Sequence, residues 1–394
     1  MPWQILDPAS VSYSEYQHPA FPNRRFNCDH FYAQLNQVRA YKGFEVSFLG
    51  SSIEGRDIHA VRWGTGPIKV VLWSQMHGNE STATRAFFDL FEFLNKGSGC
   101  EQWSEQLSLV FIPVLNPDGL ERFQRRNAWD IDLNRDAVSQ SSPEIKILWE
   151  TIKQEKADWC FNMHDQRNLF NVQGTSTPAT IAFLSPSTGK PEFSQNQADA
   201  QMLIDQLNKD LQHRIPGAIS RFTDEFYPSA TGDNLQQQGY RTVLVESGGH
   251  RKDPERMVAR EMNFWLLLHS FDLIASGKWH KGTRMGYGTI PENDQKMVDL
   301  MLRNVRIEHN GQSLVTDVGI EYKEVQISDN PEEFEIQAFV SQLGDLRHYH
   351  GYEEWDAEGQ YTASPLKWQG QASFVLSGNN EKFVHVENGQ IRYE

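Results

Sequence analysis

Several things that this sequence has little of narrow the range of functions. Its 394 residues include three cysteines, Cys28, Cys100 and Cys160, and none of them lie at CxxC spacing. An odd number leaves at least one thiol without a partner in the chain, which favours a reducing compartment. We therefore expect a cytoplasmic protein.

A segment able to enter a membrane is also lacking. The most apolar stretch, Phe264 to Ala275, is too short to span a bilayer and contains His269 and Asp272. The first residues, MPWQILDPASVSYSEY, have neither a basic start nor an apolar run, so they do not resemble a signal peptide. We expect no membrane partner.

Positive charge is scarce. The chain has 37 Lys and Arg against 52 Asp and Glu, a formal net charge of -15. An acidic surface argues against binding to nucleic acid or anionic membrane, because both attract basic patches. Hydrophobic residues still make up 39% of the chain. That is enough for a packed core, so a wholly disordered chain is excluded.

Predicted strands and helices alternate through the first part of the chain. A hairpin at 45–63 precedes buried strands at 68–73, 107–115, 158–163, 180–184 and 241–246. Helical spacing or caps predict helices at 83–94, from 143, at 197–211 and at 254–276. This alternation predicts an α/β fold with a largely parallel sheet, in which ligands bind at the carboxyl ends of the strands.

The character of the sequence changes near residue 280. The stretch SGKWHKGTRMGYGTIPEN is rich in Gly and charge, as is typical of a linker. Short alternating runs such as EFEIQAFVS follow it. We therefore predict a catalytic domain at 1–280 and a small β-rich domain of unassigned role at 281–394.

Side chains able to bind a metal follow two of the predicted strands. His77 and Glu80 lie just past the strand at 68–73, and His164 follows the strand at 158–163. A catalytic zinc takes about three protein ligands and keeps a position open for water. One such residue alone is more often an ordinary polar group. Two such loops, each at the end of a strand, favour a shared site.

A third strand carries an acid at its end. The apolar run RTVLVESGG reaches Glu246 before two glycines. A buried acid is unfavourable without a partner or a task. The sequence therefore indicates either a salt-bridged glutamate or a general base that takes a proton from a metal-activated water.

Arginines gather in one segment of this acidic chain. NPDGLERFQRRNAWDIDLNRD, from Asn116 to Asp136, follows the strand at 107–115. It contains four arginines: Arg122, Arg125, Arg126 and Arg135. They are either exposed to solvent or bind an anion, since arginine pairs with a carboxylate through two parallel hydrogen bonds.

Five motifs in order, MHGNE, NPDG, RRN…DLNR, NMHD and VESGG, resemble those of the zinc carboxypeptidase (metallocarboxypeptidase, carboxypeptidase A-like) family. The resemblance runs from about Gly43 to Trp265. It implies a mixed, mostly parallel eight-stranded sheet between helices. It also implies one Zn²⁺ per chain, bound by His77, Glu80 and His164.

The resemblance further implies roles for the residues around the metal. Glu246 would be the general base and acid, and Arg125 would polarise the scissile carbonyl group, with neighbouring Arg126 as a rival. Asp132 would orient a zinc-bound histidine, His77. The substrate's terminal carboxylate would be bound by two residues of DLNR, Asn134 and Arg135.

Departures from the family pattern concern the segment before Glu246. The family has a mobile tyrosine some twenty residues before its base, and Tyr227 is the nearest candidate, with Tyr240 as the alternative. Thr231 and Asp233 lie where a specificity pocket would be lined. Asp233 would select a basic group there, or it is simply a turn residue of TGDN.

Three functions remain open. The first is hydrolysis of a C-terminal peptide bond next to a free carboxylate, which NPDG and RRN favour. The second is a zinc deacylase of N-acyl amino acids, of the succinylglutamate desuccinylase or aspartoacylase type. The third is a catalytically silent binding module, which the retention of Glu246 and of all three metal-ligand candidates disfavours.

Overall fold

The structure is a computed structural model that describes residues 11–96, 100–190, 194–359, 362–363, 366–377, 383–388 and 390–393. The chain divides into two compact units. The first comprises Met1–Gln166 and Ala179–Asn293, and the second Arg167–Pro178 and Asp294–Glu394. The division thus falls at 293/294 instead of 280, and a short internal segment belongs to the second unit.

The predicted linker is wrong because this segment is folded onto the first unit. It forms η4 (Lys278–Lys281) and α9 (Arg284–Thr289). The Asp205 carboxylate accepts a hydrogen bond from the Thr283 N–H at 2.7 Å. Tyr287 is buried, and its hydroxyl accepts from the Ser185 N–H at 3.2 Å.

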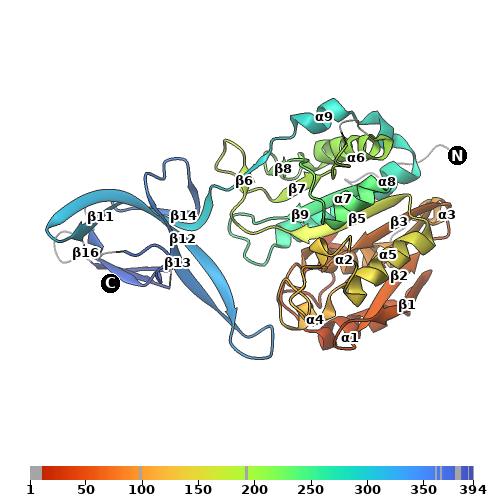
Figure 1. The fold of residues 1–394 in the computed structure, drawn as a ribbon, viewed down its shortest axis with the longest axis horizontal. Helices are drawn as coiled ribbons and strands as arrows, with labels where there is room; N and C mark the ends of the chain where they lie inside the picture. Colours follow the sequence, from red (N-terminus) through yellow and green to blue (C-terminus); the bar gives the residue numbers. More distant parts are fainter. Residues whose placement is uncertain are drawn as a thin grey trace. The chain divides into compact units, whose positions relative to one another are not determined.

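An eight-stranded sheet forms the centre of the first unit, in the order β1-β2-β4-β3-β5-β9-β7-β8 (Figure 1). The neighbours β3 and β4, β3 and β5, β5 and β9, and β7 and β8 are parallel. This confirms the predicted mixed, mostly parallel sheet. The strands are β1 (Phe44–Ser51), β2 (Asp57–Trp63), β3 (Ile68–Trp73), β4 (Leu107–Ile112), β5 (Trp159–Asp165), β7 (Ile181–Leu184), β8 (Ile219–Arg221) and β9 (Arg241–Ser247).

Helices cover both faces of this sheet, so its central strands are apolar on both sides. Val70 and Leu72 of β3 belong to the core on one face, and Val71 and Trp73 to the core on the other. The helices of the first core include α1 (Cys28–Val38), α2 (Thr82–Lys96), α6 (Gln195–Leu211) and α8 (Met257–Ala275), and those of the second include α5 (Pro143–Glu155) and α7 (Thr231–Gln237).

The predicted strands and helices are confirmed, but several ends differ. β4 ends before Pro113, which has no N–H to donate, and not at residue 115. α8 begins at Met257 and not at residue 254, because Asp253 caps it through the N–H groups of Met257 and Val258 at 2.8 and 2.7 Å. TGDN opens α7, so the interpretation of Asp233 as a simple turn residue is wrong.

The second unit is rich in strands, as predicted, and has its own apolar core. β11 (Met297–His309) and β12 (Gln312–Gln326) form a long hairpin. Asn310 and Gly311 turn it with φ of 51° and 75°, as a two-residue hairpin turn requires. Further strands of this unit include β6 (Asn171–Val172), β13 (Phe334–Gly344) and β14 (His350–Asp356). No helix in the described part of the chain combines the length and apolar character that crossing a membrane requires.

Candidate metal and catalytic site

The loop after β3 is held in one shape by close backbone packing. A Cβ atom on Gly78 would lie 1.9 Å from the carbonyl carbon of Gly119, so only glycine allows this approach. The Gln75 side chain donates to the Gly78 carbonyl at 2.6 Å. The glycines of MHGNE and NPDG therefore bring their two loops together, which places His77 and Glu80 at the carboxyl end of the sheet.

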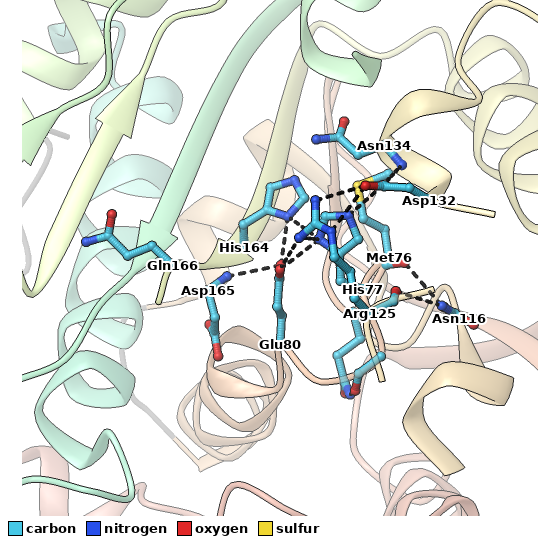
Figure 2. Close-up of polar contacts among 12 residues, drawn as sticks. Met76, His77, Glu80, Asn116, Arg125, Asp132, Asn134, His164, Asp165 and Gln166 are labelled. Atoms are coloured by element: carbon cyan, nitrogen blue, oxygen red, sulfur yellow. Dashed lines mark hydrogen bonds and ion pairs between the residues drawn. The ribbon is translucent and has the colours of Figure 1, made fainter. Parts of the chain in front are cut away.

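Three buried side chains converge there: His77, Glu80 and His164 (Figure 2). His77 Nδ1 lies 2.8 Å from Glu80 Oε1, and His164 Nδ1 lies 2.8 Å from Glu80 Oε2. The two Nδ1 atoms are 3.2 Å apart. One ligand atom from each residue lies within 4.8 Å of the others, so the three side chains that the sequence predicted as ligands are brought together.

The donor set fits a zinc ion. Two imidazole nitrogens and a carboxylate oxygen match a catalytic zinc site with three protein ligands. The far side of His77 is also suited, because its Nε2 lies 2.9 Å from Asp132 Oδ1. Such a carboxylate orients a metal-binding histidine. Nε2 of His164 is buried without a hydrogen-bond partner among the described residues.

Electrostatics favour the protonation states that metal binding needs at Glu80 and His164. At His77, burial would lower the pKa, but Glu80 and Asp132 raise it. Burial alone would raise the pKa of Glu80, but the charges and hydrogen bonds of His77 and His164 bring it well below its usual range. Burial lowers the pKa of His164 against the opposing effect of Glu80. An ionised carboxylate and a neutral imidazole are the forms that bind metal.

Glu246 lies directly beside His164. The two are paired residues of the parallel strands β5 and β9. Burial raises the pKa of Glu246, and the negative charges of Glu80 and Asp165 raise it further against Arg125 and Arg256. A carboxyl group with a raised pKa next to a metal site is suited to accept and return a proton near neutral pH.

Of the two adjacent arginines, only Arg125 reaches this cluster (Figure 2). Its Nη1 lies 3.0 Å from Glu80 Oε1 and 3.1 Å from His77 Nδ1. Its Nε donates to Asp132 Oδ2 at 3.1 Å. Arg126 instead donates to the carbonyl of Asp130, within its own loop, at 2.6 Å.

Asp132 connects His77 with the DLNR segment. Its Oδ1 also accepts from the Asn134 N–H at 3.0 Å and caps η3 (Leu133–Arg135). Burial would raise the pKa of Asp132, but the hydrogen bond to His77 and the charges of His77, Arg125 and Arg135 hold it well below its usual range. Asp132 is therefore an ionised anchor for both segments.

The predicted carboxylate clamp and Tyr227 lie close together. The Asn134 side-chain oxygen accepts from the Thr231 N–H at 3.0 Å. The Arg135 guanidinium stacks on the Tyr227 ring, 4.2 Å from its centre. Tyr227 is half-exposed, whereas the alternative, Tyr240, packs against the second core.

Asp233 holds the Tyr227 segment in place. Its Oδ1 accepts from the Tyr227 N–H at 3.0 Å. Burial raises the pKa of Asp233 to about 6, and the hydrogen bond and Arg135 oppose the rise.

One residue of the site was missed by the sequence reasoning. The Asn116 side chain donates to the carbonyls of Met76 and Arg125, at 3.3 and 3.5 Å, and accepts from the Gly119 N–H at 2.9 Å. It therefore fixes the segment before His77 against the segment that carries Arg125. Its place in NPDG is the available signal, although Asn-Pro and Asp-Gly are by themselves typical of ordinary turns.

Comparison with known proteins shows what parts of this chain are similar to. Residues 32–220, just under half of the chain, match the model of the zinc carboxypeptidase family. The family implies zinc. The matched range ends before Glu246, so it covers the metal-ligand candidates but not the candidate base.

Individual relatives cover only part of the chain. Rat carboxypeptidase D is 31% identical over 132 residues, which are 28% of this chain and 10% of that protein. Inactive metallocarboxypeptidase ECM14 of Ajellomyces dermatitidis is 31% identical over 102 residues, 22% of this chain and 17% of that protein. The chain therefore spans a small part of the length of these curated relatives, and they include a protein named inactive.

A solved metallo-carboxypeptidase from Burkholderia cenocepacia has the same fold. It superposes with a TM-score of 0.53 at 17% sequence identity, over 64% of this chain and 70% of that one.

Proposed function

We propose that this chain is a zinc-dependent carboxypeptidase, which hydrolyses the C-terminal peptide bond next to a free carboxylate. The observation that carries the proposal is the convergence of His77, Glu80 and His164, with Glu246 paired beside His164. A metal site and a carboxyl group with a raised pKa together form the minimal apparatus for activating water.

Each residue around the metal site has its own role in the proposed reaction. A Zn²⁺ ion held by His77, Glu80 and His164 would supply a water of lowered pKa and a Lewis acid for the carbonyl group. Glu246 accepts the proton of the attacking water and later gives it to the leaving amine. Arg125 donates N–H groups to the carbonyl oxygen as negative charge develops there.

Asn134 and Arg135 bind the terminal carboxylate of the peptide. Arg135 is exposed, and its planar guanidinium suits a carboxylate. Tyr227 lies over this guanidinium, so it would contact the end of the bound substrate. Binding of the free carboxylate would restrict cleavage to the last residue of a peptide.

The protein would act in the cytoplasm. This part of the proposal rests on the three cysteines, which are all buried and free of disulfides.

The test compares three substrate classes with the zinc-loaded chain: free peptides, the same peptides with an amidated C-terminus, and small N-acyl amino acids. Release of C-terminal residues from the free peptides alone supports the proposal. Turnover of N-acyl amino acids without peptide cleavage would instead support the deacylase. Zinc binding without any turnover would support a silent binding module, as in the relative named inactive.

A further inference from the structure

Asp165 ties the strand that carries His164 to the loop that carries Glu80. Its backbone N–H donates to Glu80 Oε2 at 3.1 Å, while its carboxylate points away from Glu80 (Figure 2). That carboxylate accepts from the Thr82 hydroxyl at 2.7 Å and from the Thr82 N–H at 3.3 Å. Thr82 is the first residue of α2, so Asp165 also fixes the start of this helix.

Arg256 closes the carboxyl ends of the two strands that carry His164 and Glu246. Its Nη1 donates to the Ser247 carbonyl at 2.7 Å, and its Nη2 to the Gln166 carbonyl at 2.8 Å. The Ser247 carbonyl also accepts from the Gln166 N–H at 2.9 Å. The planar fork of arginine thus continues the ladder between β5 and β9 beyond its last pair.

The two side chains also attract each other. Arg256 Nη1 lies 3.7 Å from Asp165 Oδ2, and both side chains are about nine-tenths buried. Three carboxyl groups interact here: Glu80 raises the pKa of Asp165, and Glu80 and Asp165 both raise the pKa of Glu246. The guanidinium of Arg256 opposes this repulsion.

Arg256 directly precedes α8, and its backbone conformation is unusual. Arg256 has φ 53° and ψ 39°, a left-handed conformation that is unfavourable for a residue with a Cβ atom. Asp253 already caps α8. The helix start therefore does not depend on the Arg256 guanidinium.

We propose that Arg256 and Asp165 form a brace that fixes the positions of His164, Glu246 and Glu80 relative to one another. Arg256 is then a positioning residue: it touches neither substrate nor metal and acts through two backbone carbonyls and Asp165. The predicted effect of this brace on kcat rests on the proposed function. The effect on zinc affinity stands without it.

The test uses Arg256→Gln and Arg256→Lys in the full chain. The matched control is Arg241→Gln, which removes the ion pair between Arg241 and Asp199, at 2.6 Å, from the opposite end of β9. Zinc affinity is measured by competition with a chelator, and kcat and KM with a free peptide. The melting temperature of the metal-free proteins reports on stability.

For Arg256→Gln we expect zinc affinity and kcat each to fall about 10–100-fold, with KM unchanged. Arg256→Lys should recover only part of this loss, because one ammonium group cannot reproduce the fork. The control should lose stability to a similar degree but keep zinc affinity and kcat.

Wild-type zinc affinity and kcat in Arg256→Gln would overturn the proposal, and so would equal losses in the control. Wild-type zinc affinity and kcat in Arg256→Lys would show that the positive charge alone is sufficient. That result would also contradict the proposal, because the proposal requires both hydrogen bonds of the guanidinium. If the glutamine variant does not fold, the lysine variant carries the test. If the wild type cleaves no peptide, the proposed function fails, while the zinc affinities still decide whether the brace exists.

Discussion

The first unit contains two groups of buried charged residues, and the two groups differ in how completely their charges are paired. Asp89 of α2 and Arg260 of α8 are fully buried and form two hydrogen bonds, at 2.5 and 2.8 Å. Asp89 also accepts from the Tyr13 hydroxyl and the His18 N–H, at 2.8 and 2.7 Å. Arg260 further donates to the carbonyls of Phe21 and His18.

The group around His77, Glu80 and His164 is equally buried but differently paired. His164 Nε2 is without a partner within the described residues, and the pKa values of Glu80 and Glu246 are displaced in opposite directions. Like charges lie close together on neighbouring strand ends. This is unfavourable for folding but leaves ligand atoms and a proton acceptor available.

The comparison distinguishes a group of buried charges that stabilises the fold from one that is suited to binding a metal and accepting a proton. In the first group every charge meets an opposite charge or a dipole, and the N-terminal segment is thereby joined to α2 and α8. In the second, the Nδ1 atoms of His77 and His164 face each other beside the Glu80 carboxylate, an arrangement that would suit a metal ion. Four experiments test this difference, from the largest expected effect to the smallest.

Glu246→Gln should separate activity from stability. Because it removes the proton acceptor, kcat should fall about 10²–10⁴-fold. The melting temperature of the metal-free protein should rise, since a buried acid with a raised pKa is replaced by a neutral side chain. Peptide turnover and thermal unfolding measure the two effects. Unchanged turnover would remove Glu246 from the mechanism.

Arg125→Ala and Arg126→Ala form a matched pair on adjacent residues. Loss of the Arg125 donors should lower kcat about 10²–10³-fold. Arg126→Ala should leave kcat near the wild-type value, because the Arg126 guanidinium donates to the Asp130 carbonyl in its own loop. Both variants are assayed with the same free peptide. A larger loss in Arg126→Ala would reverse the assignment.

Asp89→Ala should act on folding alone. It leaves the Arg260 guanidinium buried without its counter-charge, which typically costs about 3–5 kcal/mol of unfolding free energy. Denaturant unfolding measures the loss, and zinc content of the folded fraction is the control. Wild-type stability, or a selective loss of zinc, would contradict the comparison.

Asp233→Asn should change the pH dependence of stability. The pKa of Asp233 is raised from 3.8 to about 6 in the folded state. Its contribution to stability is therefore fully present below pH 3.8 and is lost as pH rises to about 6. As pH rises through this window, the unfolding free energy of the asparagine variant should increase relative to that of the wild type, by at most about 3 kcal/mol.

Unfolding free energies at pH 4 and pH 7.5 measure this difference. Asn retains an oxygen that can accept from the Tyr227 N–H, so the contact itself should persist. An equal difference between the two proteins at both pH values would show that Asp233 is not buried as described.

Much of the sheet was predictable because its central strands are apolar on both faces. β3, with the sequence IKVVLW, is found at the predicted residues. Errors arose where one side chain decides an end, as Asp253 does for α8. The folded segment at 278–289 was missed because its contacts with Asp205 and Ser185 are remote in sequence.

The residue types of the site were predictable from motifs, but its contacts were not. Sequence could not separate Arg125 from Arg126, because adjacent side chains with the same chemistry differ only in direction. Arg256 lies in none of the five motifs, and the two carbonyls that it binds lie at the ends of two separate strands. Such links follow from strand register, which is a property of the folded sheet.

The most direct test of the account is the zinc content of the wild type and of His164→Ala, measured by mass spectrometry on protein never exposed to a chelator. We predict about one zinc per wild-type chain and none in His164→Ala. An alanine variant that keeps its zinc, or a wild type that holds none, would contradict the assignment of His77, Glu80 and His164 as a metal site.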